Sequence, residues 1–243
     1  MWRDDLRGIC YIALKDMKTY YLKPPAISWG IIFPLAWILA FYLRNPRNFE
    51  DLVPGLIAMT VLFSTTALEA VVINFELRIG ALERLLLAPI NLSAVLLGKL
   101  LGGVIFGLLM ATLVSLGTII SLGLLQVRVL DLAAVLLLSV FVFSALGTLI
   151  CVSVKEVFEA QTLANLPRFL MVFLCGVFYP ISAMPAPLQS IAYLLPLTYT
   201  VEGIERAFSG TGAAVSAYHL LVLAIFIVIF TLPAMRLLRR RFA

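Results

Sequence analysis

Six long apolar segments constrain this chain more than any other feature of its sequence. They are 26–43, 52–74, 100–125, 132–154, 163–179 and 218–235. Crossing a bilayer takes roughly 20 apolar residues as a helix, at a rise of about 1.5 Å per residue. A backbone in lipid must satisfy its own hydrogen bonds, and these segments are too long for barrel strands. We therefore expect an all-α integral membrane protein with six transmembrane helices, forming a single transmembrane domain over 1–243.

The composition leaves little room for a soluble domain. Of 243 residues, 63% are hydrophobic and only 13% are charged. The first 25 residues mix both charge signs, so we expect no cleavable signal peptide and a first span that stays as an anchor. Cys10, Cys151 and Cys175 are scattered, without the close spacing of a metal site or a disulfide framework. We interpret them as small apolar residues.

The basic residues predict the orientation of the spans. The cytoplasmic side of a membrane protein carries the excess of lysine and arginine. With the N-terminus inside, fourteen cations are placed inside and four outside (Arg44, Arg47, Arg128 and Arg206), which together account for all 18. The inner set is Arg3, Arg7, Lys15, Lys18, Lys23, Arg78, Arg84, Lys99, Lys155, Arg168, Arg236, Arg239, Arg240 and Arg241. We expect both termini in the cytoplasm, and we assign the net charge of +5 to orientation rather than to nucleic acid.

The first 24 residues predict an amphipathic helix along the inner membrane surface. Its apolar residues recur at helical spacing, whereas Asp4, Asp5, Lys15, Asp16 and Lys18 occupy other faces. The apolar set is Trp2, Leu6, Ile9, Ala13, Met17 and Tyr20. Anchoring alone and anchoring combined with a partner contact are both compatible with this pattern.

A second amphipathic helix is predicted over 75–90, between the second and third spans. Phe75, Ile79, Leu82 and Leu86 form one stripe, and charged residues fill the rest. Pro89 closes the helix, because its ring and missing amide oppose continuation. Periodicity alone is compatible with two roles. The helix could be a linker with solvated charges, or a lever that enters a cleft of a partner protein.

Resemblance favours the lever. The run "RIGALERLLLAPINLSAVLLGKLL" resembles the corresponding loop of the type-2 ATP-binding-cassette (ABC) exporter permeases, and "GVFYPISAMPAPLQSIAYLLPLTYTVEGIERAF" resembles the hallmark that follows their fifth span. In that family the loop is the coupling helix that docks on the ATPase subunit. The chain length and the motif "LERLLLAP" are similar to those of the small drug, polyketide and nodulation-factor exporters, and the glycan exporters are the alternative branch. The resemblance implies these docking residues: Glu76, Arg78, Gly80, Glu83, Arg84 and Pro89.

Frequent prolines predict a broken segment over 180–200, on the outer side. A re-entrant or interfacial helix fits, because irregular backbone at membrane depth is tolerated where it lines a cavity. The resemblance favours a gate or exit vestibule, and an interfacial loop is the alternative. The candidate gate residues are Tyr179, Pro180, Pro185 and Pro196.

Glu69 is the ionisable residue inside the second span and is a further pathway candidate. It could equally reach the cytoplasmic interface, about 7.5 Å away at helical rise.

In the third span Gly103, Gly107, Ala111 and Ser115 form a small-residue ridge that favours close helix packing within the chain. His219 has no neighbour spaced for a metal site, and we assign it no chemistry.

No phosphate-binding loop or hydrolase motif occurs in the sequence. We expect a non-enzymatic exporter subunit of the cell membrane, without a cofactor of its own, that moves an amphipathic or lipid-linked substrate. Its expected partners are two cytoplasmic ATPase subunits, which would hold ATP and Mg, and a second copy or paralogue, as well as membrane lipid. The alternatives are a membrane-embedded lipid-modifying transferase, for which Asp131, Glu156 and Glu159 form no convincing cluster, and a non-transporting anchor for an ATPase.

Overall fold

The computed structural model describes residues 2–44, 50–87, 90–123, 126–209, 215 and 217–242, and every regular element in these ranges is helical. The helices are α1 (Trp2–Asp16), α2 (Pro24–Ile27), α3 (Phe33–Arg44), α4 (Val53–Arg78), α5 (Ala81–Leu86), α6 (Leu92–Leu122), α7 (Val129–Ser153), α8 (Val157–Leu174), α9 (Ala186–Ala192), α10 (Pro196–Phe208) and α11 (Ala217–Phe242). Two π-helical turns, Met17–Tyr21 and Ser28–Ile32, connect α1, α2 and α3. The prediction of an all-α membrane protein is confirmed.

Within the described residues, four stretches of helix are long and apolar enough to cross a membrane: Glu50–Arg78, Leu92–Leu122, Val129–Ser153 and Ala217–Arg240. They correspond to the expected second, third, fourth and sixth spans. The expected first span is divided among α2, the second π-helical turn and α3, of which Phe33–Leu43 is a shorter apolar helix. The expected fifth span overlaps α8. Six crossings therefore stay a prediction.

Among the helix boundaries that differ from the expected ones, two have local physical reasons. Helix α6 begins at Leu92, eight residues before the predicted start at Leu100, because Lys99 is paired with carboxylates inside the bundle and does not end the apolar segment. Helix α8 ends at Leu174 rather than near Tyr179. Gly176 has a φ of 84°, a left-handed conformation that an α-helix does not accommodate.

Helix α4 forms the centre of the bundle. Its most apolar stretch of 18 residues is 94% buried, and α6, α7, α8 and α10 pack around α4. The small-residue ridge of α6 faces this core: a Cβ on Gly103 would lie 2.6 Å from Ser144 Oγ of α7, and a Cβ on Gly107 would meet Thr65 of α4. The ridge therefore packs within the chain, as predicted.

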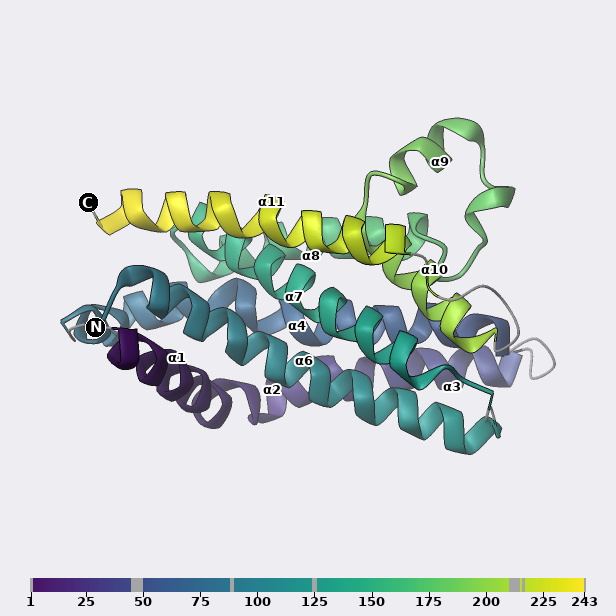
Figure 1. The fold of residues 1–243 in the computed structure, drawn as a ribbon, viewed down its shortest axis with the longest axis horizontal. Helices are drawn as coiled ribbons and strands as arrows, with labels where there is room; N and C mark the ends of the chain where they lie inside the picture. The colour runs from purple at the N-terminus through teal and green to yellow at the C-terminus, as the bar shows by residue number, and fades with distance from the viewer. Residues whose placement is uncertain are drawn as a thin grey trace.

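The two ends of the bundle differ (Figure 1). Helix α1 begins and α11 ends at one end, and α9 lies beside the bundle at the other. Lys99 and Arg168 are 1% and 2% exposed inside α6 and α8, so neither is a loop cation and the inner set falls from fourteen to twelve. The asymmetry against the four outer cations persists, and the cytoplasmic placement of the termini stays a prediction.

Prolines begin the short helices at the α9 end. Pro180 precedes the 3₁₀ turn Ile181–Ala183, Pro185 precedes α9, and Pro196 is the first residue of α10. Proline suits these positions because its fixed φ matches a helical start, where the amide has no partner within the helix. The chain forms a 3₁₀ turn and two separate helices here, and a re-entrant path through the membrane stays a prediction.

Replacing Gly103 by leucine should loosen the packing of α6 against α7. The new side chain would collide with Ser144 Oγ and with Glu69 Oε2, which lies 2.8 Å from the site of a Cβ. We expect a loss of about 1–3 kcal/mol in unfolding free energy. Thermal unfolding of the purified protein in detergent measures the loss.

Gly117→Leu is the matched control on the same helix, because nothing lies within 4 Å of a Cβ at Gly117. Equal unfolding temperatures for the two variants would contradict the packing described for the ridge.

Candidate functional site

The segment predicted as one helix over 75–90 is divided in two. Phe75 to Arg78 continue α4, and α5 begins at Ala81. Gly80 between them has a φ of 69° and a ψ of 12°, in the left-handed region that favours glycine. This conformation interrupts the helix and redirects the chain, so the predicted start of the amphipathic helix at Phe75 is corrected to Ala81. The predicted stripe is divided too: Ile79 is 52% exposed and Leu82 is buried.

The docking residues separate into exposed and buried groups. Arg78 and Arg84 are exposed, and a Cβ on Gly80 would meet nothing within 4 Å. Glu76 is fully buried in this conformation, and its docking role stays a prediction. The backbone of Glu83 lies in α5, but its side chain and the whole of Pro89 lie outside the described residues.

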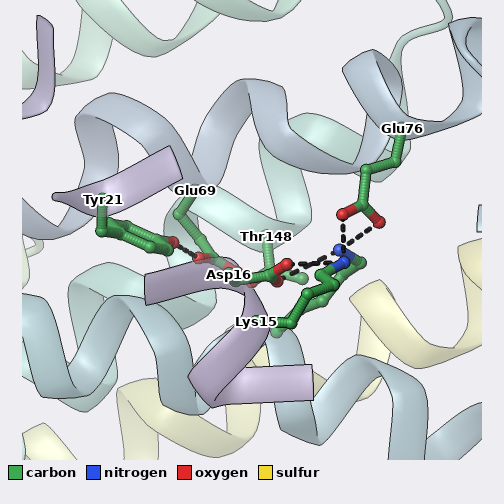
Figure 2. A network of polar contacts seen from close by, with 7 residues as sticks. Lys15, Asp16, Tyr21, Glu69, Glu76 and Thr148 are labelled. Carbon is green, nitrogen blue, oxygen red and sulfur yellow. Dashed lines mark hydrogen bonds and ion pairs between the residues drawn. The ribbon is translucent and has the colours of Figure 1, made fainter. Parts of the chain in front are cut away.

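Glu76 instead belongs to a buried group of two lysines and two carboxylates, which we call the four-charge cluster: Lys15, Asp16, Glu76 and Lys99. Lys99 Nζ lies 2.6 Å from Glu76 Oε2 and 3.2 Å from Asp16 Oδ2. Lys15 Nζ lies 2.8 Å from Asp16 Oδ1 and donates a hydrogen bond to Glu76 Oε1. Figure 2 shows Lys15 and Asp16 of α1 converging with Glu76 of α4. The cluster joins α1, α4 and α6.

The four-charge cluster has a formal net charge of zero, and three of its four side chains are almost completely excluded from water. Asp16 and Glu76 are fully buried and Lys99 is 1% exposed, whereas Lys15 reaches the edge. Burial raises the pKa of Asp16, and the positive charge of Lys99 opposes that rise. Burial would lower the pKa of Lys15, but hydrogen bonds to Asp16 and Glu76 raise it overall. Each charge is therefore tolerated because its counterions are present.

Glu69 extends the polar network toward the middle of the bundle. It lies two turns before Glu76 on α4, is 2% exposed, and accepts hydrogen bonds from the Tyr21 hydroxyl and, at 2.8 Å, from Thr148 Oγ1 of α7. Figure 2 shows Tyr21 pointing at Glu69. Gly103 leaves room for this carboxylate, because a Cβ there would lie 2.8 Å from Glu69 Oε2. Glu69 is held inside the protein, which corrects the alternative that it reaches the interface.

A second connection ties α1 to the chain after α5. The backbone amide and side-chain amide of Asn91 donate to Asp5 at 3.0 and 2.6 Å. These hydrogen bonds lower the pKa of Asp5, because they favour its charged form. Helix α1 is thus bonded to Glu76 before α5 and to Asn91 after it.

The sequence prediction missed most of this network. Asp16 was assigned to the polar side of α1, but it shares the buried face with Ile12 and Ala13. The i, i+4 spacing of Ile12 and Asp16 was the available signal. Nothing in the local sequence indicates that Lys99 would meet Asp16, which is 83 residues away.

The candidate gate residues do not converge with this network. Tyr179, Pro180 and Pro185 are exposed and Pro196 is buried at the start of α10, whereas Glu69 lies in the polar network described above. At the α9 end His219 has a partner that the sequence did not indicate: its Nε2 lies 3.1 Å from Glu202 Oε2.

Removing one charge from the four-charge cluster should destabilise the protein strongly. We expect Lys99→Met to cost about 3–5 kcal/mol, because Glu76 and Asp16 would keep a buried negative charge without its main counterion. Combining it with Glu76→Gln restores the charge balance, so the double variant should lose less than the sum of the two single losses. Thermal unfolding in detergent measures all three.

Lys18→Met is the control, since Lys18 is an exposed lysine in the turn that follows α1, and we expect a change within about 0.5 kcal/mol. Additive losses in the double variant would show that the two residues are not coupled.

Comparison with known proteins matches the chain to transport permeases. Residues 7–209 match the family described as ABC-2 type transporter. The inner membrane transport permease YadH of Escherichia coli (strain K12) is 32% identical over 231 aligned residues, covering 90% of this chain and 87% of YadH. Nodulation protein J of Bradyrhizobium diazoefficiens is 26% identical, with 99% of this chain and 92% of that protein covered. The probable multidrug ABC transporter permease YbhS of E. coli (strain K12) is 28% identical over 86% of this chain and 51% of YbhS.

These matches confirm the resemblance found in the two sequence runs and account for the absence of a phosphate-binding loop, because ATP-binding subunits are the partners of such permeases. The chain therefore belongs to the ABC-2 type transporter family and is a membrane permease subunit of an ABC transporter.

Proposed function

We propose that this permease exports an amphipathic or lipid-linked substrate, driven by two cytoplasmic ATPase subunits that dock on α5. The proposal rests on the exposed segment around α5. The four-charge cluster holds the end of α4 directly before this segment. Arg78, Arg84, Ile79 and Leu87 are exposed around it, with Leu87 86% exposed. Such a mixed basic and apolar surface suits a protein contact.

The attachment of α5 suits a lever. Leu82 of α5 is 2% exposed and packs into an apolar cluster with Ile12 of α1, Ile73 of α4 and Val95 of α6. The four-charge cluster lies on α4 directly before it, and the bond between Asp5 and Asn91 lies after it. A displacement of α5 would therefore move α1, α4 and α6 together, because packed cores do not deform continuously.

In this proposal the chain makes six crossings with both termini in the cytoplasm and pairs with a second copy or a paralogue. ATP and Mg bind to the ATPase subunits. The exposed residues Tyr179, Pro180 and Pro185 contribute to an outer gate, with Pro196 at the base of α10. The position of α9 at the end opposite α1 supports this assignment (Figure 1).

Charge reversal on α5 tests the docking. We expect Arg84→Glu to reduce permease-stimulated ATP hydrolysis by about tenfold or more, because an acidic side chain would face groups selected for a basic one. The ATPase that co-purifies with the permease is reconstituted with it in proteoliposomes, and hydrolysis and substrate release are measured together. We expect Glu83→Arg to reduce permease-stimulated hydrolysis and substrate release in the same way.

Arg206→Glu is the control, since Arg206 is exposed on α10 near the other end of the bundle (Figure 1). Insertion into the membrane and unfolding temperature should be unchanged in all three variants. Normal transport in both α5 variants would refute the docking role. An ATPase that co-purifies and hydrolyses ATP without substrate movement would instead identify the chain as an anchor.

A further inference from the structure

Arg168 is a second buried cation, in the middle of α8. Its side chain is 2% exposed and extends toward α4, where Nε donates a hydrogen bond to Thr66 Oγ1 at 2.6 Å. Its Nη1 donates to Asn165 Oδ1 at 2.9 Å. Its Nη2 is buried without a hydrogen-bond partner. Both of its hydrogen-bond partners are neutral.

No carboxylate within the described ranges forms an ion pair with Arg168. Lys99, by comparison, lies within 3.2 Å of two carboxylates. The ring of Phe63, 5.9 Å from the guanidinium carbon, contributes a cation–π contact of about 0.5–2 kcal/mol. Neutral hydrogen bonds and one ring compensate only part of the cost of burying a charge. The guanidinium therefore has capacity for an anion.

A shallow, open groove of about 1010 Å³ lies on one face of the same helix. Apart from Val154, its lining residues all belong to α8, and they include Phe158, Leu166, Phe169 and Phe173. Asn165 also lines the groove, and it is the residue that accepts the hydrogen bond from Nη1. The Asn165 side chain is therefore in contact with the guanidinium and also lines the groove.

We propose that Arg168, behind Asn165, recognises the anionic group of an amphipathic substrate whose apolar part lies along the phenylalanines of the groove. The anionic group is a carboxylate or a phosphate, either of which can accept two hydrogen bonds from one guanidinium. Rotation of the Asn165 side chain opens Nη1 and Nη2 to the groove. This assignment of substrate class rests on the proposed export function.

The placement of charges along α8 favours this position for the anion. Glu159, which also lines the groove, lies nine residues before Arg168, or about 13 Å along the helix. An anion at Arg168 is therefore distant from that carboxylate, and the apolar wall lies on the same side of the helix as Asn165. A charged group deep in a membrane protein is costly, so such groups are rare and mark functional sites.

Binding of matched probes tests the proposal without the ATPase, so a failure of transport would not affect the result. The purified permease is placed in nanodiscs of phosphatidylcholine, and fluorescence anisotropy gives the Kd of nitrobenzoxadiazole-labelled dodecanoic acid and of its primary amide. We expect the acid to bind at least about tenfold more tightly than the amide. In Arg168→Gln the two probes should bind within about twofold of each other, whereas Arg168→Lys should keep part of the preference.

Two further variants keep the test informative if Arg168→Gln does not fold. Asn165→Ala retains the charge and opens it to the groove, so the preference for the acid should increase. Glu159→Gln removes the carboxylate that lines the groove and should leave the preference intact or increase it. Equal binding of both probes by the wild type, a preference that survives in Arg168→Gln, or a decrease in Asn165→Ala would overturn the proposal.

The source of the anion is separated by two competitors. Nanodiscs containing phosphatidylglycerol supply a lipid phosphate with a net negative charge, unlike the zwitterionic phosphatidylcholine, and inorganic phosphate supplies a free anion. If phosphatidylglycerol abolishes the preference for the acid, Arg168 binds membrane lipid and the substrate assignment is wrong. If the preference for the acid persists with phosphatidylglycerol and with inorganic phosphate, the result supports recognition of an amphipathic acid.

Discussion

The buried pairing of two lysines with two carboxylates holds one end of this protein together. Lys15 and Asp16 come from α1, Glu76 from the end of α4 and Lys99 from α6. None of the three helices can leave without exposing an unpaired charge inside the bundle, which is strongly unfavourable. The position of α5 depends on the same pairing, because α5 begins five residues after Glu76.

Beyond this cluster a second group of polar contacts, made by Tyr21, Glu69 and Thr148, lies deeper in the bundle. It joins α4, the helix on which most others pack, to α7. The glycines of α6 and α7 provide the space, since a Cβ at Gly103 or Gly147 would lie within 3 Å of Glu69. For a permease subunit that works with ATP-binding partners, a rigid connection between the exposed α5 and the bundle centre is what the proposed coupling requires.

The two buried cations differ in what surrounds them. Lys99 has its counterions within the chain, so its charge is used in holding the helices together. Arg168 has two neutral hydrogen-bond partners, one of which lines an apolar groove, and a free Nη2. A charge that the protein neutralises itself contributes to its structure, whereas an incompletely compensated one is available to a ligand.

Sequence alone determined the helical class, because apolar segments of this length have few other solutions in lipid, and the family, because two motifs occur in the expected order. It also determined where prolines start short helices. Only the tertiary structure decided the roles of the charged residues. Lys15 and Glu76 are 61 residues apart and Asp16 and Lys99 are 83 apart, so their pairing depends on how α1 packs. Helical periodicity describes the faces of one helix, but which face is buried is decided by the helices that surround it.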